Sequence, residues 1–580
     1  MKKLFYNVWV ICVWLMAGCS EELNLSPIDT ISPENAFNSA NDLQLYTNSF
    51  YRILPDGDAI VRGDAVSDYM VRNTVTSYLT GTYTSHDVGG WSWSQLRNIN
   101  YFLENFDKAD IPDEAKGHFE GVARFFRAWF YYEKVQKWGG VPWYDKTLDV
   151  SDPDIYKARD SREFVMDKIL EDLNFACENI RSLKDETGTM VTKWVALGFK
   201  SRVCLYEGTY RKYHDEIGLQ TSAEAWLIEA VTAAEEIMES GKYQLHDTDG
   251  DLSYRNLFIQ ESVQSDEVLL SYAGSQSMRI FHDANWYFTS STYGQRLNLI
   301  KTFINTYLNR DGSRFTDHEN YDELPFWEEV ENRDLRLQQT IRMGDYSREG
   351  TPEATDFKYS FSGYQPIKFT LDSKATDGVA ENNNSLPLIR YGEILLNYAE
   401  AKAEIGGFTS NDWEISIQLL RKRAGIVDSS IPTQVDAYLQ EHYFPEISDP
   451  VLLEIRRERG IELVMEGLRF QDLMRWKQGH LLTMEYDGMY IERMDELMDV
   501  NQDGFPDVSF VSSTPSNPES GVTYYLIDGN QFKLSQGNKG KLLLFQNLTR
   551  LWEDYQYLYP VPYDEIVLNR TLEQNPQWDN

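Results

Sequence analysis

Cysteine and histidine are scarce in this chain. Only 4 cysteines and 8 histidines occur in 580 residues. No Cys-x-x-Cys pair is present and no two histidines lie four residues apart. The sequence therefore contains no spacing of Cys or His that is typical of a zinc site. Cys177 and Cys204 lie among apolar residues of two predicted helices, which favours buried free thiols. A disulfide between adjacent helices is the alternative in an oxidising compartment.

Positive charge is also in short supply. The chain has 55 Lys and Arg against 91 Asp and Glu, which gives a formal net charge of −36. A field of this sign repels phosphate backbones, which argues against nucleic-acid binding. It also disfavours polyanionic ligands, unless a local basic pocket overrides it. The acidic residues are spread along the chain and therefore indicate a solvated surface.

Long hydrophobic runs are absent beyond the N-terminus. Residues 4–16 are apolar except for Asn7 and follow Lys2 and Lys3, which is typical of a signal peptide over 1–18. The small pair Ala17-Gly18 precedes Cys19, and this resembles a bacterial lipobox whose cysteine is acylated. Ser20, Glu21 and Glu22 resemble the acidic tag of surface lipoproteins of Bacteroidetes. We expect a lipidated N-terminus and tether over 19–32, with a plain secreted protein as the alternative.

Familiar catalytic motifs are missing as well. The chain contains no HExxH, no GxSxG and no complete Walker A sequence. Acidic residues are too common for any single pair to indicate a glycosidase. No catalytic residue is therefore predicted.

Helical periodicity dominates the first half of the chain. Residues Val122, Phe126 and Trp129 share one face of a helix that ends at Gly139-Gly140. Similar patterns recur over about 40–245 and 388–426, with alanine and aromatic positions typical of tetratricopeptide-like helix pairs. Loop-rich insertions are expected over about 246–388 and 478–550. The predicted fold class is mostly α, a helical-repeat scaffold with long insertions.

Five segments carry a more specific resemblance. They are "GVARFFRAWFYYEKVQKWGGVPW", "NRDLRLQQTI", "LPLIRYGEILLNYAEAKAEIGG", "EIRRERGIELVMEGLRFQDLMRW" and "YLYPVPYDEIVLNRTLEQNPQW". In this order they resemble the SusD/RagB family of outer-membrane nutrient-binding lipoproteins. The resemblance implies a single domain over 33–580 with about four helix pairs. It also implies partnership with a SusC-like TonB-dependent transporter, for which the lipoprotein captures glycans.

Charged residues in the fourth segment form a regular series. Glu466, Arg469, Asp472 and Arg475 recur every three residues, which predicts a ladder of alternating charges along one helix. A carboxylate pair for acid–base hydrolysis is the alternative. The ladder is favoured, because an adjacent cation would keep each acid ionised. In the fifth segment, Trp578 is expected to anchor a terminal strap on the scaffold.

Two aromatic stretches are candidates for binding sugar. Flat aromatic faces suit the C–H side of a sugar ring, and planar polar groups suit its hydroxyls. The first stretch offers Arg72, Asn73, Tyr78, Tyr83, Trp91 and Trp93, although Trp93 also fits a core position of the family. The second offers His282, Asn285, Trp286, Tyr287 and Tyr293.

The stretch "DVNQDGFPD" resembles a calcium-binding loop. Asp499, Asn501, Asp503, Phe505 and Asp507 match loop positions 1, 3, 5, 7 and 9 of an EF-hand-like site. Position 12 is Phe510 rather than Glu, so the usual bidentate ligand is missing. The prediction is a structural calcium site, with a hydrated turn as the alternative. No other cofactor is required.

Together these features predict a non-catalytic, glycan-binding lipoprotein anchored on the outer face of the outer membrane. The sequence leaves two alternatives open. One is a surface glycoside hydrolase, and the other is a helical-repeat scaffold for protein interactions. The identity of the glycan cannot be read from the chain, since loop geometry sets ring and linkage preference.

Overall fold

The computed structural model describes residues 37–290 and 296–578. Predictions for the signal peptide, for Cys19 and its tether, and for Tyr293 fall outside these residues. Within them, no helix is both long and apolar enough to cross a membrane.

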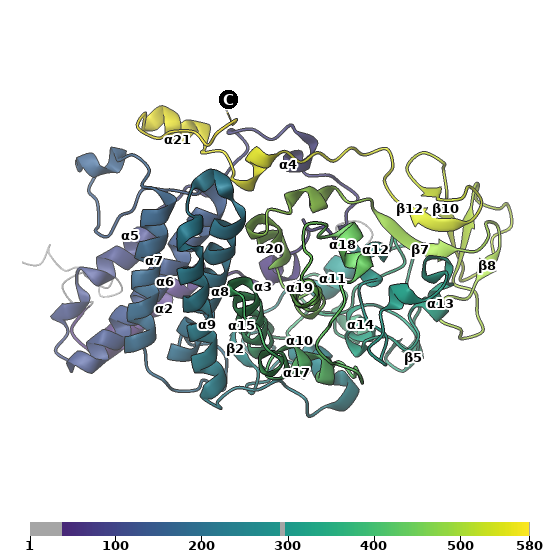
Figure 1. The fold of residues 1–580 in the computed structure, drawn as a ribbon, viewed down its shortest axis with the longest axis horizontal. Coiled ribbons are helices and arrows are strands. Elements are labelled where there is room, and N and C mark those ends of the chain that lie inside the picture. The colour runs from purple at the N-terminus through teal and green to yellow at the C-terminus, as the bar shows by residue number, and fades with distance from the viewer. Residues whose placement is uncertain (1–36, 291–295, 579–580) are drawn as a thin grey trace, which may run out of the picture.

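Long helices form one side of the molecule, as Figure 1 shows. Helix α6 packs against α7, and α8 packs against α9. Their faces are apolar and aromatic, so they bury a continuous core that includes Phe126, Trp129 and Phe199. The helices on this side are α2 (Ala40–Asn48), α5 (Ser94–Leu103), α6 (Asp113–Trp138), α7 (Arg162–Asn179), α8 (Lys193–Tyr213) and α9 (Ala223–Glu239). The short helices α3 (Gly57–Val61) and α4 (Ser77–Thr80) lie outside it and pack into separate hydrophobic clusters.

The ends of these helices follow from local sequence. Helix α6 stops at Trp138 because Gly139 takes a positive φ of 73°. The Ser161 hydroxyl accepts a hydrogen bond from the Phe164 N–H and caps α7. The predicted stop and cap are therefore confirmed.

The middle of the chain is irregular. It holds short helices and strands rather than long ones, as expected for an insertion. These elements are α10 (Ser253–Ile259), α11 (Ala284–Thr289), α12 (Lys301–Ile304), α13 (Phe326–Glu329), α14 (Leu335–Thr340), β2 (Val268–Tyr272), β3 (Asn298–Leu299), β4 (Ser347–Arg348), β5 (Thr351–Pro352) and β6 (Leu386–Arg390). Strand β1 (Met70–Val71) comes from the N-terminal part of the chain. Strand β2 pairs with β6, and β1 pairs with β3, both antiparallel.

A second group of helices lies at the centre of Figure 1. Helix α15 packs on α8 and α9 on one side and on α19 on the other, so it joins the two halves. The group comprises α15 (Tyr391–Ile405), α16 (Ser410–Glu414), α17 (Ile417–Arg423), α18 (Ala437–His442), α19 (Pro450–Glu462) and α20 (Arg469–Arg475). The mostly helical, repeat-like fold predicted from the sequence is confirmed.

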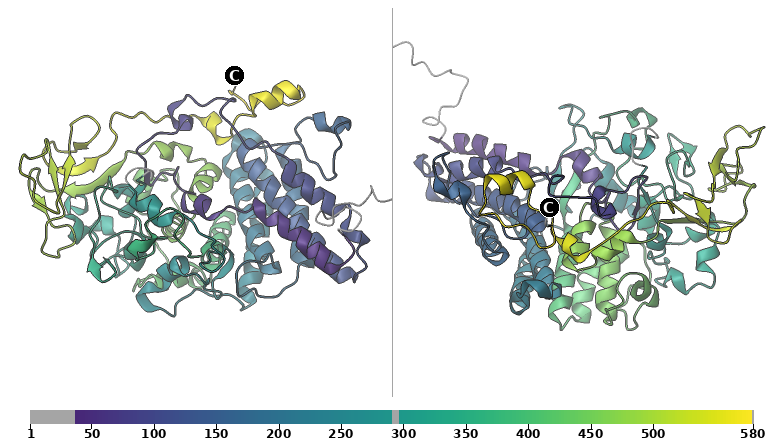
Figure 2. Two further views of the ribbon diagram at one scale, coloured as in Figure 1. Left: turned by 180° about the vertical axis from the view of Figure 1, so that it is seen from behind. Right: turned by 90° about the horizontal axis from the view of Figure 1, so that it is seen from above.

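The second expected insertion is more ordered than its composition suggested. It contains two three-stranded sheets, with strand orders β10-β9-β8 and β11-β12-β7. The strands are β7 (Asp487–Ile491), β8 (Leu497–Met498), β9 (Val508–Val511), β10 (Thr523–Leu526), β11 (Lys533–Leu534) and β12 (Gly540–Leu543). After β12 the chain runs back across the molecule to α21 (Tyr563–Leu568), beside the N-terminal helices (Figures 1 and 2).

This C-terminal strap is held by specific polar contacts. The Trp138 indole donates to the Pro560 carbonyl at 2.9 Å, and the Trp578 indole donates to the Leu558 carbonyl at 2.8 Å. Trp578 is 6% exposed. Its predicted role as an anchor is confirmed.

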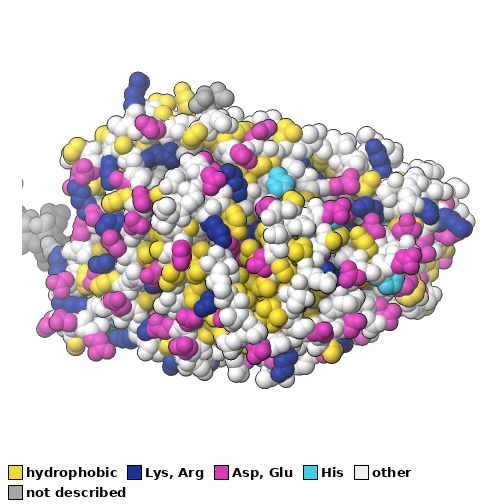
Figure 3. Space-filling view, viewed as in Figure 1, with side chains coloured by type: hydrophobic (Ala, Val, Ile, Leu, Met, Phe, Trp, Pro, Cys, Tyr) yellow, Lys and Arg dark blue, Asp and Glu magenta, His cyan; other side chains and the backbone are white. Residues whose placement is uncertain are grey.

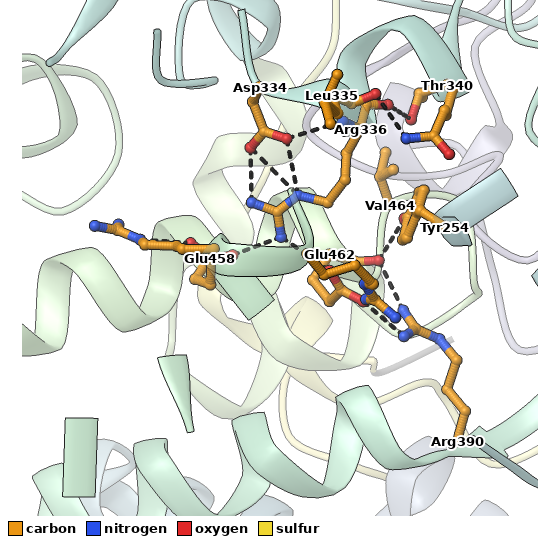
Figure 4. Close-up of polar contacts among 12 residues, drawn as sticks. Tyr254, Asp334, Leu335, Arg336, Thr340, Arg390, Glu458, Glu462 and Val464 are labelled. Atoms are coloured by element: carbon orange, nitrogen blue, oxygen red, sulfur yellow. Dashed lines mark hydrogen bonds and ion pairs between the residues drawn. The ribbon is translucent and has the colours of Figure 1, made fainter. Parts of the chain in front are cut away.

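A network of buried ion pairs ties α14, β6, α17 and α19 together (Figure 4). Glu462 accepts from Arg390 Nη1 at 2.6 Å and from Arg336 Nη1 at 2.8 Å, and it also pairs with Arg423. Burial alone would raise the pKa of Glu462, but the three guanidinium groups outweigh it and hold that pKa well below its usual range. The carboxylate is therefore a fixed structural anion.

The predicted charge ladder is only partly present. Glu466 lies before α20, and only Asp472 and Arg475 pair with each other within the series. All four side chains are buried or nearly so, which requires partners brought from elsewhere in the chain. Those partners are Lys368 and Arg390 for Glu466, Asp68 for Arg469, Arg459 for Asp472 and Glu400 for Arg475. The series is a set of core ion pairs rather than a surface ladder.

On the face drawn in Figure 3, acidic side chains are distributed rather than gathered in one patch. Figure 3 shows Asp and Glu side chains scattered over the visible face, interspersed with Lys and Arg. Apolar side chains gather along the middle of the same face. This distribution agrees with the solvated acidic surface expected from the composition.

Candidate carbohydrate-binding sites

The first aromatic stretch divides into buried and partly exposed residues. Tyr78 is 5% exposed and stacks on Tyr559, with ring centroids 4.5 Å apart. It fills the core beneath the C-terminal strap, so its predicted contact with a ligand is corrected to a structural role. Tyr83 is half-buried and meets Tyr78 edge-on at 5.4 Å.

Trp91 and Trp93 line a pocket of about 350 Å³. Trp91 is 8% exposed and packs edge-on against Trp138, whereas Trp93 is only half-buried. Tyr144 meets Trp93 edge-on at 5.5 Å on the same wall. Trp93 is therefore the more accessible of the two predicted tryptophans, and Tyr144 is a lining residue that the sequence analysis missed.

Polar groups and the C-terminal strap complete this aromatic pocket. Asn100 is 1% exposed and donates from Nδ2 to the carbonyls of Tyr144 and Lys146. The strap contributes Glu565, Asn569 and Leu572 to the lining of the same pocket. No local signal in the sequence could reveal this contribution, since more than 400 residues separate it from Trp93.

Most of the second aromatic stretch is buried. Asn285 is 0% exposed, and its Nδ2 donates to the Leu371 carbonyl at 2.9 Å and to Asp377 at 3.0 Å. His282 is 1% exposed and its Nε2 lies 3.0 Å from the Asn384 carbonyl oxygen. Burial lowers the pKa of His282 to about 4. Both side chains hold the loop together, which corrects the prediction that they contact a ligand.

Trp286 is half-buried and lines a polar cleft of about 650 Å³. The neighbouring Tyr287 is 3% exposed and points into the core instead, as expected for adjacent residues on a short helix. Charged side chains of both signs line the cleft and neutralise one another, with Arg348 Nη2 2.7 Å from Asp377 Oδ1. The charged lining residues are Arg342, Arg348, Glu353, Asp356, Lys358, Lys374, Asp377 and Asp507.

Arg72 and Asn73 of the first stretch lie in the segment that follows β1. Asn73 is exposed, whereas Arg72 is half-buried. Burial lowers the pKa of Arg72 from its usual value.

The calcium prediction gains no support from the geometry. Both Asp499 carboxylate oxygens accept backbone hydrogen bonds, from Asp503 and Gly504. Burial, together with repulsion from the neighbouring Asp503 and Asp499, raises the pKa of Asp507 to about 6, and the Phe505 side chain is exposed. Asn501 donates to Asp503. In the described part of the chain, no group of three or more His, Cys, Asp or Glu side chains is arranged to hold a metal ion.

The two cysteines of the described residues are buried free thiols, as the sequence favoured. Burial raises the pKa of Cys177 to about 12, and the pKa of Cys204 is raised for the same reason. Neither thiol is a reactive nucleophile at neutral pH.

Aromatic and polar clefts on a helical-repeat scaffold are typical of a binding protein. Family comparisons make the class specific. The model described as "SusD family" matches residues 271–578, and the one described as "Starch-binding associating with outer membrane" matches residues 36–205. The chain belongs to the SusD family.

Individual relatives are distant in sequence and close in fold. SusD-like protein P38 of Formosa agariphila is 21% identical over 535 residues, covering 85% of this chain and 96% of that protein. A SusD-like protein of Bacteroides fragilis has 22% identity and a TM-score of 0.69, over 95% of this chain and 100% of that chain. A SusD-like carbohydrate-binding protein of the same species has 19% identity and a TM-score of 0.67, over 92% and 99%. These structures share the fold with the present chain.

Proposed function

We propose that the protein is a cell-surface lipoprotein that captures an oligosaccharide or polysaccharide and delivers it to a SusC-like TonB-dependent transporter. The observation that supports this most is the aromatic pocket. Its lining combines the half-buried Trp93 and Tyr144 with Glu565 and Asn569. Membership of the SusD family, with its outer-membrane description, supports the same function.

The pocket chemistry suits a sugar ring. Indole and phenol faces are apolar enough to cover the C–H side of a pyranose, while amide and carboxylate groups match its hydroxyls. The volume of about 350 Å³ lies within the range of small-ligand pockets. The Trp286 cleft combines a tryptophan with planar charged groups in the same way and is the second binding region in this proposal.

We favour binding without catalysis over a surface hydrolase. Glu466 and Asp472, the acids that could have formed a hydrolytic pair, lie inside the ion-pair network. Burial would raise the pKa of Asp472, but Arg459 and Arg475 outweigh it and lower that pKa. An acid held ionised in this way is a poor proton donor.

Affinity electrophoresis in native gels that contain different glycans tests the proposal. We expect retardation of the wild type by at least one glycan, and weaker retardation of Trp93→Ala and Trp286→Ala. Trp327→Ala is the matched control, because Trp327 is 42% exposed and lines neither pocket. Wild-type migration unchanged by every glycan would favour the protein-interaction scaffold instead.

Release of reducing ends separates binding from hydrolysis. We expect none from any glycan that retards the protein. Turnover that disappears when one Asp or Glu is replaced would refute the non-catalytic proposal. Copurification of a TonB-dependent transporter with the full-length chain, from outer membranes of the native host, tests the proposed partner.

A further inference from the structure

The aromatic pocket is lined by aliphatic side chains as well as by rings. Leu148 and Ile155 are only half-buried there, and both belong to the loop between α6 and α7. Apolar surface that stays in contact with water costs free energy, and a ligand that covers it recovers that free energy. The pocket therefore favours a ligand with an apolar group of its own. Its aliphatic lining residues are Leu96, Pro142, Leu148, Ile155 and Leu572.

The loop between α6 and α7 is fixed in place by polar contacts. Asn100 Nδ2, on α5, donates to the Tyr144 carbonyl at 2.9 Å and to the Lys146 carbonyl at 3.2 Å. Lys146 Nζ in turn lies 2.9 Å from Asp154 Oδ2, beside Ile155. These contacts form this part of the pocket without a ligand, and such preorganisation lowers the free-energy cost of binding.

The C-terminal strap is bonded to the same loop. Thr571 Oγ1 donates to the Tyr156 carbonyl at 2.7 Å. This bond joins the two residues that follow Ile155 and precede Leu572, which line the pocket from the loop and from the strap. The aliphatic lining is therefore a built surface rather than a chance contact of two loops.

Arg97 places hydrogen-bond donors beside this aliphatic surface. It lines the pocket, and its Nη1 donates to the Leu148 carbonyl. In the described part of the chain its guanidinium forms no ion pair, so its other N–H groups are available to an acceptor on a ligand. Lys146, the other cation of the lining, is already paired with Asp152 and Asp154.

The charges of the lining suit an uncharged substituent. Arg97 and Glu565, the two lining residues not yet paired in this way, have opposite signs. An acidic group would be attracted by one of them and repelled by the other, and the same holds for an amino group. A neutral group with a hydrogen-bond acceptor meets neither penalty.

We propose that the aromatic pocket binds a sugar unit that carries an acetyl group, either an N-acetyl sugar or an O-acetyl ester. Leu148 and Ile155 cover the acetyl methyl group, and Arg97 donates to its carbonyl oxygen. The sugar ring packs on Trp93 or Tyr144. A bare hydroxyl in the same place loses its hydration against aliphatic side chains and gains no partner. This inference rests on the proposed glycan-binding function and names the substituent that the pocket selects.

Matched neutral glycans test the requirement for an acetyl group. Chitotetraose and cellotetraose share one backbone and linkage, and they differ in an acetamido or a hydroxyl group on each ring. Acetylated xylan, before and after mild base removes its esters, isolates the O-acetyl group. Isothermal titration calorimetry compares the first pair and native gels compare the second. We expect the wild type to bind the acetylated member of at least one pair about tenfold more tightly or better.

Ile155→Ser and Leu148→Ser should each reduce this preference, because they remove the aliphatic surface that covers the methyl group. We expect affinity for the acetylated ligand to fall about tenfold and affinity for its unsubstituted partner to change little. Val150→Ser is the matched control. It makes a comparable change in the same loop at a residue that is 96% exposed and outside the pocket, and it should bind like the wild type.

Arg97→Gln should weaken binding of the acetylated ligand more than binding of its unsubstituted partner, since it removes the donor to the acetyl carbonyl. Circular dichroism of each variant, with a melting temperature near that of the wild type, separates these effects from unfolding. Saturation-transfer NMR checks the contact directly. The acetyl methyl protons of the bound sugar should receive more saturation than its ring protons, and Ile155→Ser should reduce that excess.

The outcomes separate this inference from the proposed function. Equal affinity for both members of each pair would overturn the inference. So would variants at Ile155, Leu148 and Arg97 that keep the full preference. Retardation by unsubstituted glycans alone would overturn it and leave the proposed function intact, whereas binding to no glycan of any kind would refute both.

Discussion

Glu462 and Arg390 face each other inside the protein, with Oε1 and Nη1 2.6 Å apart and both side chains at most 1% exposed. Glu462 lies at the end of α19 and Arg390 at the end of β6, just before α15. The pair therefore links the start of α15, which packs on the N-terminal helices α8 and α9, to the end of α19 (Figure 4). This buried ion pair is a direct polar contact between the two halves of the protein.

Glu462→Ala should strongly destabilise the protein. It leaves Arg390, Arg336 and Arg423 buried with one carboxylate fewer, and breaking a buried pair costs about 3–5 kcal/mol. Urea denaturation followed by circular dichroism measures the loss. Glu496→Ala, which removes an exposed partner of Arg493, should cost less than about 1 kcal/mol. Equal losses for the two variants would contradict the assigned role of Glu462.

His246 should make stability depend on pH in the alkaline range. Its Nε2 lies 2.8 Å from Asp249 and its Nδ1 3.0 Å from Asp266. Hydrogen bonds to Asp266, together with Asp249, raise the pKa of His246 from 6.5 to about 9. Since the folded state holds the proton more tightly, this stabilisation is complete below pH 6.5 and is lost as pH rises through 9.

The test compares melting temperatures of the wild type and His246→Gln between pH 6 and pH 10. We expect the wild type to be the more stable at pH 6, and the difference to shrink above pH 6.5 and to be lost as the pH rises through about 9. The comparison cancels other groups that titrate in this range. A difference that stays constant with pH would show that His246 acts through packing rather than charge.

Gly208 should be needed for the close packing of α8 on α9. A Cβ at this position would lie 2.7 Å from Leu227 Cγ and 3.1 Å from the Leu227 backbone nitrogen. Gly208→Ala gains about 1 kcal/mol of helix propensity but should still lose about 1–3 kcal/mol net to overpacking. Thermal unfolding measures the change. Gly89→Ala, where a Cβ meets nothing within 4 Å, should leave the melting temperature near that of the wild type.

Long helices could be predicted because their signal is local. Helix α8 places Val195, Phe199 and Val203 on one buried face, which the period of 3.6 residues reveals directly. The strands of the second insertion have two to five residues each. Such strands are too short for the alternation of apolar and polar residues to be recognised in a loop-rich sequence. Their pairing depends on contacts between distant segments.

Buried charge was the feature that sequence patterns described least well. Arg469 has Asp472 three residues away, yet it pairs with Asp68, which precedes it by about 400 residues. The same limit applies to the candidate sites. Composition singled out Trp93 and Trp286, but the strap residues that line the same pocket as Trp93 come beside it only in the folded chain.

Asn575 should couple the C-terminal strap to glycan binding. Its Nδ2 donates to the Tyr559 carbonyl at 2.6 Å, and its Oδ1 accepts from Arg159 Nη2 at 2.8 Å. Asn575→Ala removes both hydrogen bonds and leaves the partly buried Tyr559 carbonyl without this donor, although Arg159 keeps its bonds to the carbonyls of Gly140, Trp138 and Glu573. The change should cost about 1–3 kcal/mol of local stability. Because the strap supplies Glu565 and Leu572 to the aromatic pocket, its loosening should widen that pocket.

Two measurements check this coupling. Limited proteolysis should cut Asn575→Ala within the strap faster than the wild type, since the strap opens more often. Retardation by the glycan that depends on Trp93 should weaken in parallel. Asn530→Ala, at an exposed turn between β10 and β11, is the matched control and should change neither result. Faster proteolysis with unchanged glycan binding would show that the strap does not contribute to glycan binding in this pocket.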